Sequence, residues 1–364
     1  MKRNDLPKFI KQSDSNELNN SNLYNKYGKN LYILYTPYSL LTTLSEIIDY
    51  PDIEHHILYK RPGGQEFLDL VRESFRDFKN IKINHVLEED LAYILEYLKS
   101  EVKYADRIYI PHTAYMDTLI AVEYLGLNSN PYVILIEEGL VCYFDLPEDE
   151  KYLIDISSRK IQEAKVFLPE YVSSQLKSLK ISKLNTANFK LIIEKILDYI
   201  LKQNILTENV LEKIKNAEVI ILLNDSFYLK ELGLFEEYKK IFQEYIQFLS
   251  KKNISFLLKY HPKDEKNLYL GDNNIINIHY LPFEIISYLC NNIKILVNWS
   301  MPSTSIYTPK IFSRDYVAII ENSLSFQTSF EAKNIQKLIE MGIKIETIQS
   351  LKDFKKVLRK FNLL

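Results

Sequence analysis

Short apolar runs alternate with stretches of helical period along the first part of the chain. The apolar runs are rich in β-branched and aromatic residues, as strands are, and they lie at 31–35, 56–59, 81–86, 107–110 and 133–136. Between them, apolar residues recur at the spacing of one helix face, at 39–48, 65–78, 91–102 and 113–125. This alternation predicts a parallel sheet with helices on both faces.

A second alternating series follows further along the chain. Its expected strands lie at 218–223, 254–259, 275–279, 293–298 and 316–320. Its expected helices lie at 232–249, at 283–290 and from about 303 onward. The stretch between the two series is rich in lysine, amphipathic and without a convincing strand. The predicted segments are a polar, mobile N-terminus (1–28), a first α/β domain (29–170), a helical connection (171–215), a second α/β domain (216–345) and a C-terminal helix (346–364).

Composition and charge exclude several classes of protein. A formal net charge of -2 gives no general electrostatic reason to bind nucleic acid. The two cysteines, Cys142 and Cys290, are far apart, so they form neither a disulfide framework nor a metal-ligand spacing. No apolar segment has the length of a signal peptide core or of a membrane-spanning helix. We therefore expect a cytoplasmic protein, with peripheral association at the inner membrane left open.

Open parallel sheets bind ligands beyond the carboxyl ends of their strands, and an acidic pair stands at such a position. Glu137 and Glu138 follow the apolar run YVILI directly, and Gly139 then permits a sharp turn. A carboxylate that is buried beside a second one has a raised pKa, which suits a general base. A solvated turn is the alternative interpretation of these three residues taken alone.

Two further groups follow predicted strands in the second series. His261 can donate a proton to a leaving phosphate, while Pro262 fixes the adjacent backbone and Lys259 adds positive charge. An exposed loop histidine is the alternative. Glu284 lies in the first turn of a predicted helix, where a carboxylate can accept hydrogen bonds from ribose hydroxyls. A favourable interaction with the helix dipole is the structural explanation of the same residue.

A run of hydroxyl residues opens the next predicted helix. Ser303, Thr304 and Ser305 exceed the single hydroxyl that helix capping needs, which favours a phosphate site at the free helix amides. Asn224 follows another predicted strand and is expected to line the same cleft. The sequence has no P-loop, no dinucleotide fingerprint and no Asp-x-Asp motif for a divalent ion. We therefore expect no metal.

Taken in order, these motifs resemble those of the bacterial sialyltransferases with the GT-B fold, which include lipooligosaccharide sialyltransferases and capsular polysialyltransferases. That family has an acidic-acidic-glycine motif, a His-Pro motif and a Ser-Ser/Thr motif. The matching residues here are Glu137-Glu138-Gly139, His261-Pro262 and Ser303-Thr304. The resemblance implies an α/β fold of GT-B type, in which two Rossmann-like domains have parallel sheets that face a central cleft.

The resemblance also implies an activity. The protein would be an inverting, metal-independent glycosyltransferase that moves sialic acid, or a related nonulosonate, from a CMP-sugar to a hydroxyl of lipooligosaccharide or capsule. Glu137 would be the preferred base on the acceptor side, with Glu138 as the other candidate. His261 would donate a proton or a hydrogen bond to the leaving CMP. The hydroxyl run and Lys259 would bind the phosphate of CMP, and Glu284 would bind its ribose. No cofactor beyond the CMP-sugar donor is expected.

Alternatives stay open at this point. Transferases that use CMP-Kdo share a similar layout, and a CDP-glycerol-dependent polymer transferase also combines histidines with a phosphate site at a helix start. A non-catalytic module that binds nucleotides or glycans is the third reading, because a fold alone never establishes activity. The donor sugar, the acceptor, single transfer or polymerisation, and the oligomeric state are not determined by the sequence.

Overall fold

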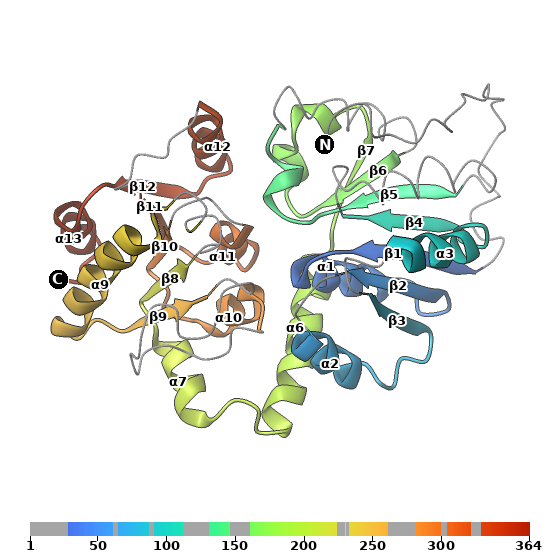
Figure 1. The fold of residues 1–364 in the computed structure, drawn as a ribbon, viewed down its shortest axis with the longest axis horizontal. Helices are drawn as coiled ribbons and strands as arrows, with labels where there is room; N and C mark the ends of the chain where they lie inside the picture. Colours follow the sequence, from blue (N-terminus) through green and yellow to red (C-terminus); the bar gives the residue numbers. More distant parts are fainter. Residues whose placement is uncertain are drawn as a thin grey trace.

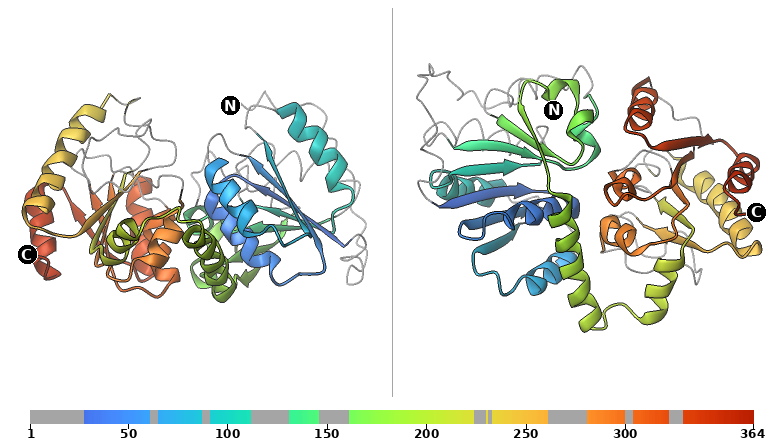
Figure 2. Two further views of the ribbon diagram at one scale, coloured as in Figure 1. Left: turned by 90° about the horizontal axis from the view of Figure 1, so that it is seen from below. Right: turned by 180° about the vertical axis from the view of Figure 1, so that it is seen from behind.

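The computed structural model describes residues 28–60, 65–86, 91–111, 131–145, 161–223, 230, 233–260, 281–299, 304–321 and 329–364. Within these residues the chain forms two parallel β-sheets, each flanked by helices, that lie beside one another (Figure 1). The first sheet uses the N-terminal half of the chain and the second sheet uses the C-terminal half. Two helices that follow one another in the sequence connect the two halves (Figure 2).

The first sheet has seven strands in the order β3-β2-β1-β4-β5-β6-β7, and all neighbouring strands are parallel. They are β1 (Lys29–Leu34), β2 (Glu54–Lys60), β3 (Ile81–Val86), β4 (Arg107–Ile110), β5 (Tyr132–Ile136), β6 (Ile161–Val166) and β7 (Lys180–Lys183). The apolar residues of β1, β4 and β5 are fully or almost fully buried, apart from the half-buried Tyr132 at the start of β5. This is the burial expected of parallel strands that helices cover on both faces.

The helices of the first half are α1 (Pro37–Ile47), α2 (Gln65–Ser74), α3 (Leu91–Val102) and α6 (Thr186–Lys202). Helix α1 starts three residues after β1 because Thr36 caps it, with its hydroxyl accepting from the Ser39 amide at 3.0 Å, and Pro37 occupies the first turn. All residues of α1 are buried, since the helix packs against the sheet and against α6. The start of α1 is therefore held rigidly at the carboxyl end of the sheet.

The second sheet has five strands in the order β12-β11-β10-β8-β9, again all parallel. They are β8 (Val219–Leu223), β9 (Phe256–Lys259), β10 (Ile295–Trp299), β11 (Val317–Glu321) and β12 (Lys344–Ile348). The helices of this half are α7 (Glu208–Asn216), α9 (Phe235–Lys251), α10 (Phe283–Leu289), α11 (Thr308–Ile311), α12 (Ser329–Glu340) and α13 (Leu351–Lys360). Short 3-10 helices also occur in both halves, among them η6 (Thr304–Ile306).

The two halves share an apolar core. Phe189 of α6 stacks on Phe312, which follows α11, with ring centroids 6.0 Å apart. Tyr288 of α10 donates a hydrogen bond to Glu194 of α6. One continuous cluster of buried residues includes the first sheet, α6 and the face of the second sheet that α10 and α11 cover. Helix α6 therefore packs against both halves and stabilises their arrangement.

The structure confirms most of the elements that the pattern predicted, and β3 and α3 have the predicted bounds. The pattern missed β6, β7 and β12. The connection predicted over 171–215 contains the strand β7 before its helices, and the predicted C-terminal helix begins at 351, after β12. Polar residues interrupt all three strands, because β7 and β12 are edge strands and β6 lies next to an edge. The predictions for 1–27, 113–125 and 275–279 lie outside the described residues.

None of the helices in the described part of the chain has the length and apolar character of a membrane-spanning segment.

Candidate active site

The acidic pair lies where strand β5 ends. The amide of Glu137 still donates to the carbonyl of Lys165 on β6 at 3.0 Å, so the sheet positions this residue. Gly139 has φ 103°, a conformation that side chains with a Cβ rarely adopt, and the chain then turns into the 3-10 helix η3 (Leu140–Cys142). The predicted sharp turn at the carboxyl end of a strand is confirmed.

The side chain of Glu137 is fully buried, and its two carboxylate oxygens accept four hydrogen bonds. Oε1 accepts from the hydroxyl of Tyr38 at 2.5 Å and from the hydroxyl of Tyr307. Oε2 accepts from the hydroxyl of Tyr143 and from the amide of Phe167 at 2.7 Å. We refer to Tyr38, Tyr143 and Tyr307 as the tyrosine cage. Sequence reasoning did not find these tyrosines.

The tyrosine cage joins the two halves of the protein. Tyr38 belongs to α1 and Tyr143 follows η3, whereas Tyr307 comes from the second half, directly after η6. The hydroxyls of Tyr38 and Tyr307 are 2.6 Å apart, and the rings of Tyr143 and Tyr307 meet edge to face with centroids 5.6 Å apart. Because Tyr307 follows the hydroxyl run at 303–305, the acidic motif and that run are close neighbours in space.

Burial controls the protonation of this cluster. Burial raises the pKa of the Glu137 carboxyl, and the hydrogen bonds from the cage and from the Phe167 amide act against that rise. Burial and the negative charge of Glu137 raise the pKa of each cage tyrosine well above its ordinary value. The three phenols therefore stay protonated and serve as hydrogen-bond donors to one carboxylate.

The second acid of the pair differs from the first in its exposure. Glu138 retains 8% of its surface, whereas Glu137 retains none. Nearby Cys142 is also buried, and burial together with the charge of Glu137 raises the pKa of its thiol well above the ordinary value. The thiol is therefore not activated as a nucleophile. Both acids are buried, but of the two Glu138 alone retains a small exposed fraction and lies outside the tyrosine cage.

A second polar group lies at the carboxyl end of the other sheet. Lys259 ends β9, and Glu284 is in the first turn of α10. Glu284 is 4% exposed and accepts a hydrogen bond from the Thr308 hydroxyl at 3.3 Å. Burial raises the pKa of Glu284 to about 7, while its own amide, Thr308 and the positive charge of Lys259 oppose the rise. The structure thus brings the predicted residues Lys259 and Glu284 together and adds Thr308.

Other predicted site residues are described only in part. Asn224, His261, Pro262 and Ser303 lie outside the described residues, so their roles stay predictions. Thr304 and Ser305 form the first two residues of η6, and Ser305 is half-buried. The helix predicted from about 303 is two short pieces, η6 and α11, because Pro309 starts a new turn after Tyr307. Thr308 was not predicted as a site residue; the feature of the sequence that could have indicated it is a hydroxyl residue directly before Pro309.

The Glu284 carboxyl gives a pH dependence of stability. Its pKa rises from an ordinary value of 4.5 to about 7 in the folded protein, so its contribution is complete below pH 4.5 and is lost as the pH rises through 7. At about 1.4 kcal/mol per pKa unit, that loss is about 3 kcal/mol. We expect the unfolding free energy of Glu284→Gln, relative to the parent protein, to rise by this amount between pH 4.5 and 8 in urea titrations. Exposed Glu340→Gln is the control and should show no such trend.

Comparison with known proteins identifies the class of fold. No protein-family model and no curated protein matches the chain. Among solved structures, the chain is similar to a crystal structure of UDP-N-acetylglucosamine 2-epimerase, with a TM-score of 0.51 over 91% of this chain and 86% of that one. The sequence identity is 12%, so the similarity concerns the fold. The chain has the predicted GT-B architecture of two Rossmann-like α/β domains.

Proposed function

We propose that this protein is an inverting glycosyltransferase that moves sialic acid, or a related nonulosonate, from a CMP-sugar to a hydroxyl of a cell-surface glycan. The observation that carries the proposal is the contact between Tyr307 and Glu137. Through it, the acidic motif of one domain meets the segment that follows the hydroxyl run of the other. The structural similarity to an enzyme whose name specifies a nucleotide sugar supports the coarser conclusion of a sugar-nucleotide enzyme.

The second domain is proposed to bind the donor. The Glu284 carboxyl group, held by Thr308, would accept hydrogen bonds from the ribose hydroxyls of CMP. Lys259 lies close enough for its charge to act on Glu284 and would add positive potential near the single phosphate. Backbone amides at 303–305 would bind the phosphate oxygens. A monophosphate needs only modest charge neutralisation, so these groups would replace a metal ion.

The first domain is proposed to activate the acceptor. The sequence favoured Glu137 as the base, but four donors occupy its carboxylate and it has no exposed surface. We therefore assign Glu137 to holding the turn and Glu138 to proton abstraction. The acceptor hydroxyl loses its proton to Glu138, and its oxygen forms a bond to the anomeric carbon. The bond from that carbon to the phosphate breaks on the opposite face, and His261 protonates the departing CMP.

Direct assay tests this proposal. Purified protein is incubated with CMP-sialic acid and with galactose-terminated or sialic-acid-terminated acceptors, with and without EDTA, and CMP release and product mass are measured. We expect transfer that EDTA leaves unchanged and that His261→Ala reduces at least tenfold.

UDP-N-acetylglucosamine serves as the control donor and should be neither transferred nor epimerised. If CMP is released from CMP-Kdo and not from CMP-sialic acid, the transferred sugar is Kdo. Release of glycerol phosphate from CDP-glycerol would favour the polymer transferase. CMP binding without turnover of any donor would favour the non-catalytic module, and the absence of both would refute the proposed reaction.

A further inference from the structure

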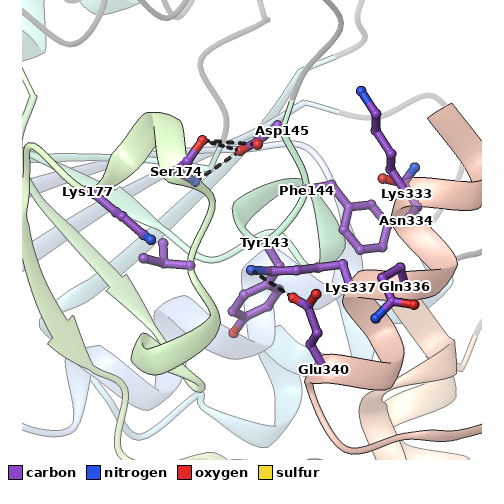
Figure 3. Close-up of a pocket in the computed structure, with 11 residues that line it drawn as sticks. Tyr143, Phe144, Asp145, Ser174, Lys177, Lys333, Asn334, Gln336, Lys337 and Glu340 are labelled. Atoms are coloured by element: carbon purple, nitrogen blue, oxygen red, sulfur yellow. Dashed lines mark hydrogen bonds and ion pairs between the residues drawn. The ribbon is translucent and has the colours of Figure 1, made fainter.

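A cavity of about 350 Å³ lies between the two domains beside the acidic turn. One wall comes from the first domain and includes Tyr143, Phe144 and Lys177, and the opposite wall is the second half of helix α12 (Figure 3). Tyr143, whose hydroxyl binds Glu137, forms part of the wall. The cavity is therefore one side chain away from the proposed acceptor-activating motif. Of the donor-binding residues that the structure describes, none lines it.

Among the described residues that line this cavity, lysines outnumber carboxylates. Three lysines line it, namely Lys177, Lys333 and Lys337, together with two carboxylates, Asp145 and Glu340. Lys337 lies 4.0 Å from Glu340 in the same helix. Neither Lys177 nor Lys333 forms an ion pair with any residue in the described part of the chain. Lys177 and Lys333 thus line the space from opposite domains, and neither is paired within the described part of the chain.

The negative group on the first-domain wall is already satisfied. Asp145 accepts hydrogen bonds from the Ser173 hydroxyl at 2.6 Å and from the Ser174 amide and hydroxyl at 3.0 and 2.9 Å. These bonds, together with the charge of Lys337, hold the pKa of Asp145 below its ordinary value against the effect of burial. Asp145 therefore stays ionised, and three lysines against two carboxylates leave the described lining with a net charge of +1.

The remaining wall suits a sugar. The ring of Phe144 offers an apolar face next to α12, and the amides of Asn334 and Gln336 offer hydrogen-bond donors and acceptors (Figure 3). Ligand pockets span about 300–1,000 Å³, so this cavity is at the small end and fits one sugar residue better than a whole nucleotide sugar. A carboxylate on that sugar would meet the unpaired lysines.

We propose that this cavity is a subsite for a carboxylate-bearing sugar, an inference that rests on the proposed glycosyltransferase function. An acidic residue of the acceptor glycan, or the donor's own sugar, would supply the carboxylate. Its charge would be neutralised by Lys177 from one domain and Lys333 from the other. Occupation of the subsite would thus favour the arrangement in which the two domains are close together.

Binding measurements test the subsite without any need for turnover. Isothermal titration compares 3'-sialyllactose with lactose, its neutral counterpart, on the full-length protein. We expect at least tenfold tighter binding of sialyllactose, and we expect Lys177→Ala/Lys333→Ala to abolish the preference. The control variant, Lys202→Ala/Lys352→Ala, removes one exposed lysine from each domain outside the cavity and should keep the preference. Higher salt should weaken the preference, because exposed charges are screened.

Competition identifies the source of the carboxylate. If CMP-sialic acid displaces sialyllactose and CMP does not, the donor sugar occupies the cavity; if neither displaces it, the acceptor does. Equal binding of sialyllactose and lactose, or an unchanged preference in the cavity double variant, would overturn the subsite. Absence of transfer with the preference intact would instead refute the proposed reaction and leave the subsite standing.

Discussion

Replacement of Glu137 by alanine is expected to lower the free energy of unfolding by about 3–5 kcal/mol, because several buried hydrogen-bond donors lose their shared acceptor. The carboxylate accepts four hydrogen bonds and is fully buried. Alanine would leave the three cage hydroxyls and the Phe167 amide without this acceptor. Each buried donor that loses its partner costs about 1–3 kcal/mol. Urea denaturation followed by circular dichroism measures the change.

Two tyrosine variants separate the cage from the general effect of losing a buried hydroxyl. Tyr307→Phe removes one of the donors to Glu137, and Tyr316→Phe removes a hydroxyl that donates to the carbonyl of Ile306 at 2.5 Å. Bonds to charged groups contribute more, about 1.5–3 kcal/mol against about 1 kcal/mol. Tyr307→Phe should therefore be the more destabilising variant. A change below 1 kcal/mol for Glu137→Ala would contradict the buried cage.

Replacement of Glu138 by alanine is expected to lower kcat for transfer by about 10²–10⁴-fold, the range of general base catalysis. Affinity for CMP should stay within about twofold of the parent value, because the donor-binding residues are proposed to lie in the second domain. Initial rates of CMP release at saturating CMP-sialic acid measure kcat, and titration calorimetry measures CMP binding. Glu212→Ala, which removes an exposed glutamate of α7, is the control for loss of negative charge.

The roles of the two acids can be told apart by Glu137→Gln. This variant keeps the size of the side chain and one carbonyl acceptor, so we expect reduced stability and a smaller loss of kcat than in Glu138→Ala. A fully active Glu138→Ala protein together with an inactive but folded Glu137→Gln protein would exchange the two roles. The folded state of each variant is checked by the same denaturation experiment.

Much of the fold could be predicted because its signals are local. A strand buried between helices must be apolar along its whole length, and β5 and β8 are continuous apolar runs of this kind. Strands β7 and β12 were missed because an edge strand has one neighbour and retains polar residues. The glycine at 139 also carried a local signal, since its φ of 103° strongly favours that residue type.

The surroundings of the acidic pair could not be predicted in the same way. The chain has 27 tyrosines, so no pattern distinguishes the three that bind Glu137. Tyr38 lies 99 residues from Glu137 in the sequence, and Tyr307 lies 170 residues from it. The Tyr38 contact arises when α1 packs on the first sheet, and the Tyr307 contact arises only when the two domains pack together. The expectation that Glu137 is the base therefore rested on its position after a strand, without knowledge of its partners.

The sequence by itself determined two α/β domains, the turn after β5 and the positions of Lys259 and Glu284 at the ends of structural elements. These features follow from periodicity and backbone preference, which act over a few residues. Only the packing of the folded chain decided that the tyrosine cage encloses Glu137 while Glu138 retains a small exposed fraction, and that Thr308 contacts Glu284. It also decided that Lys177 and Lys333 share one cavity. The physical reason is that burial and charge proximity depend on which distant segments pack together.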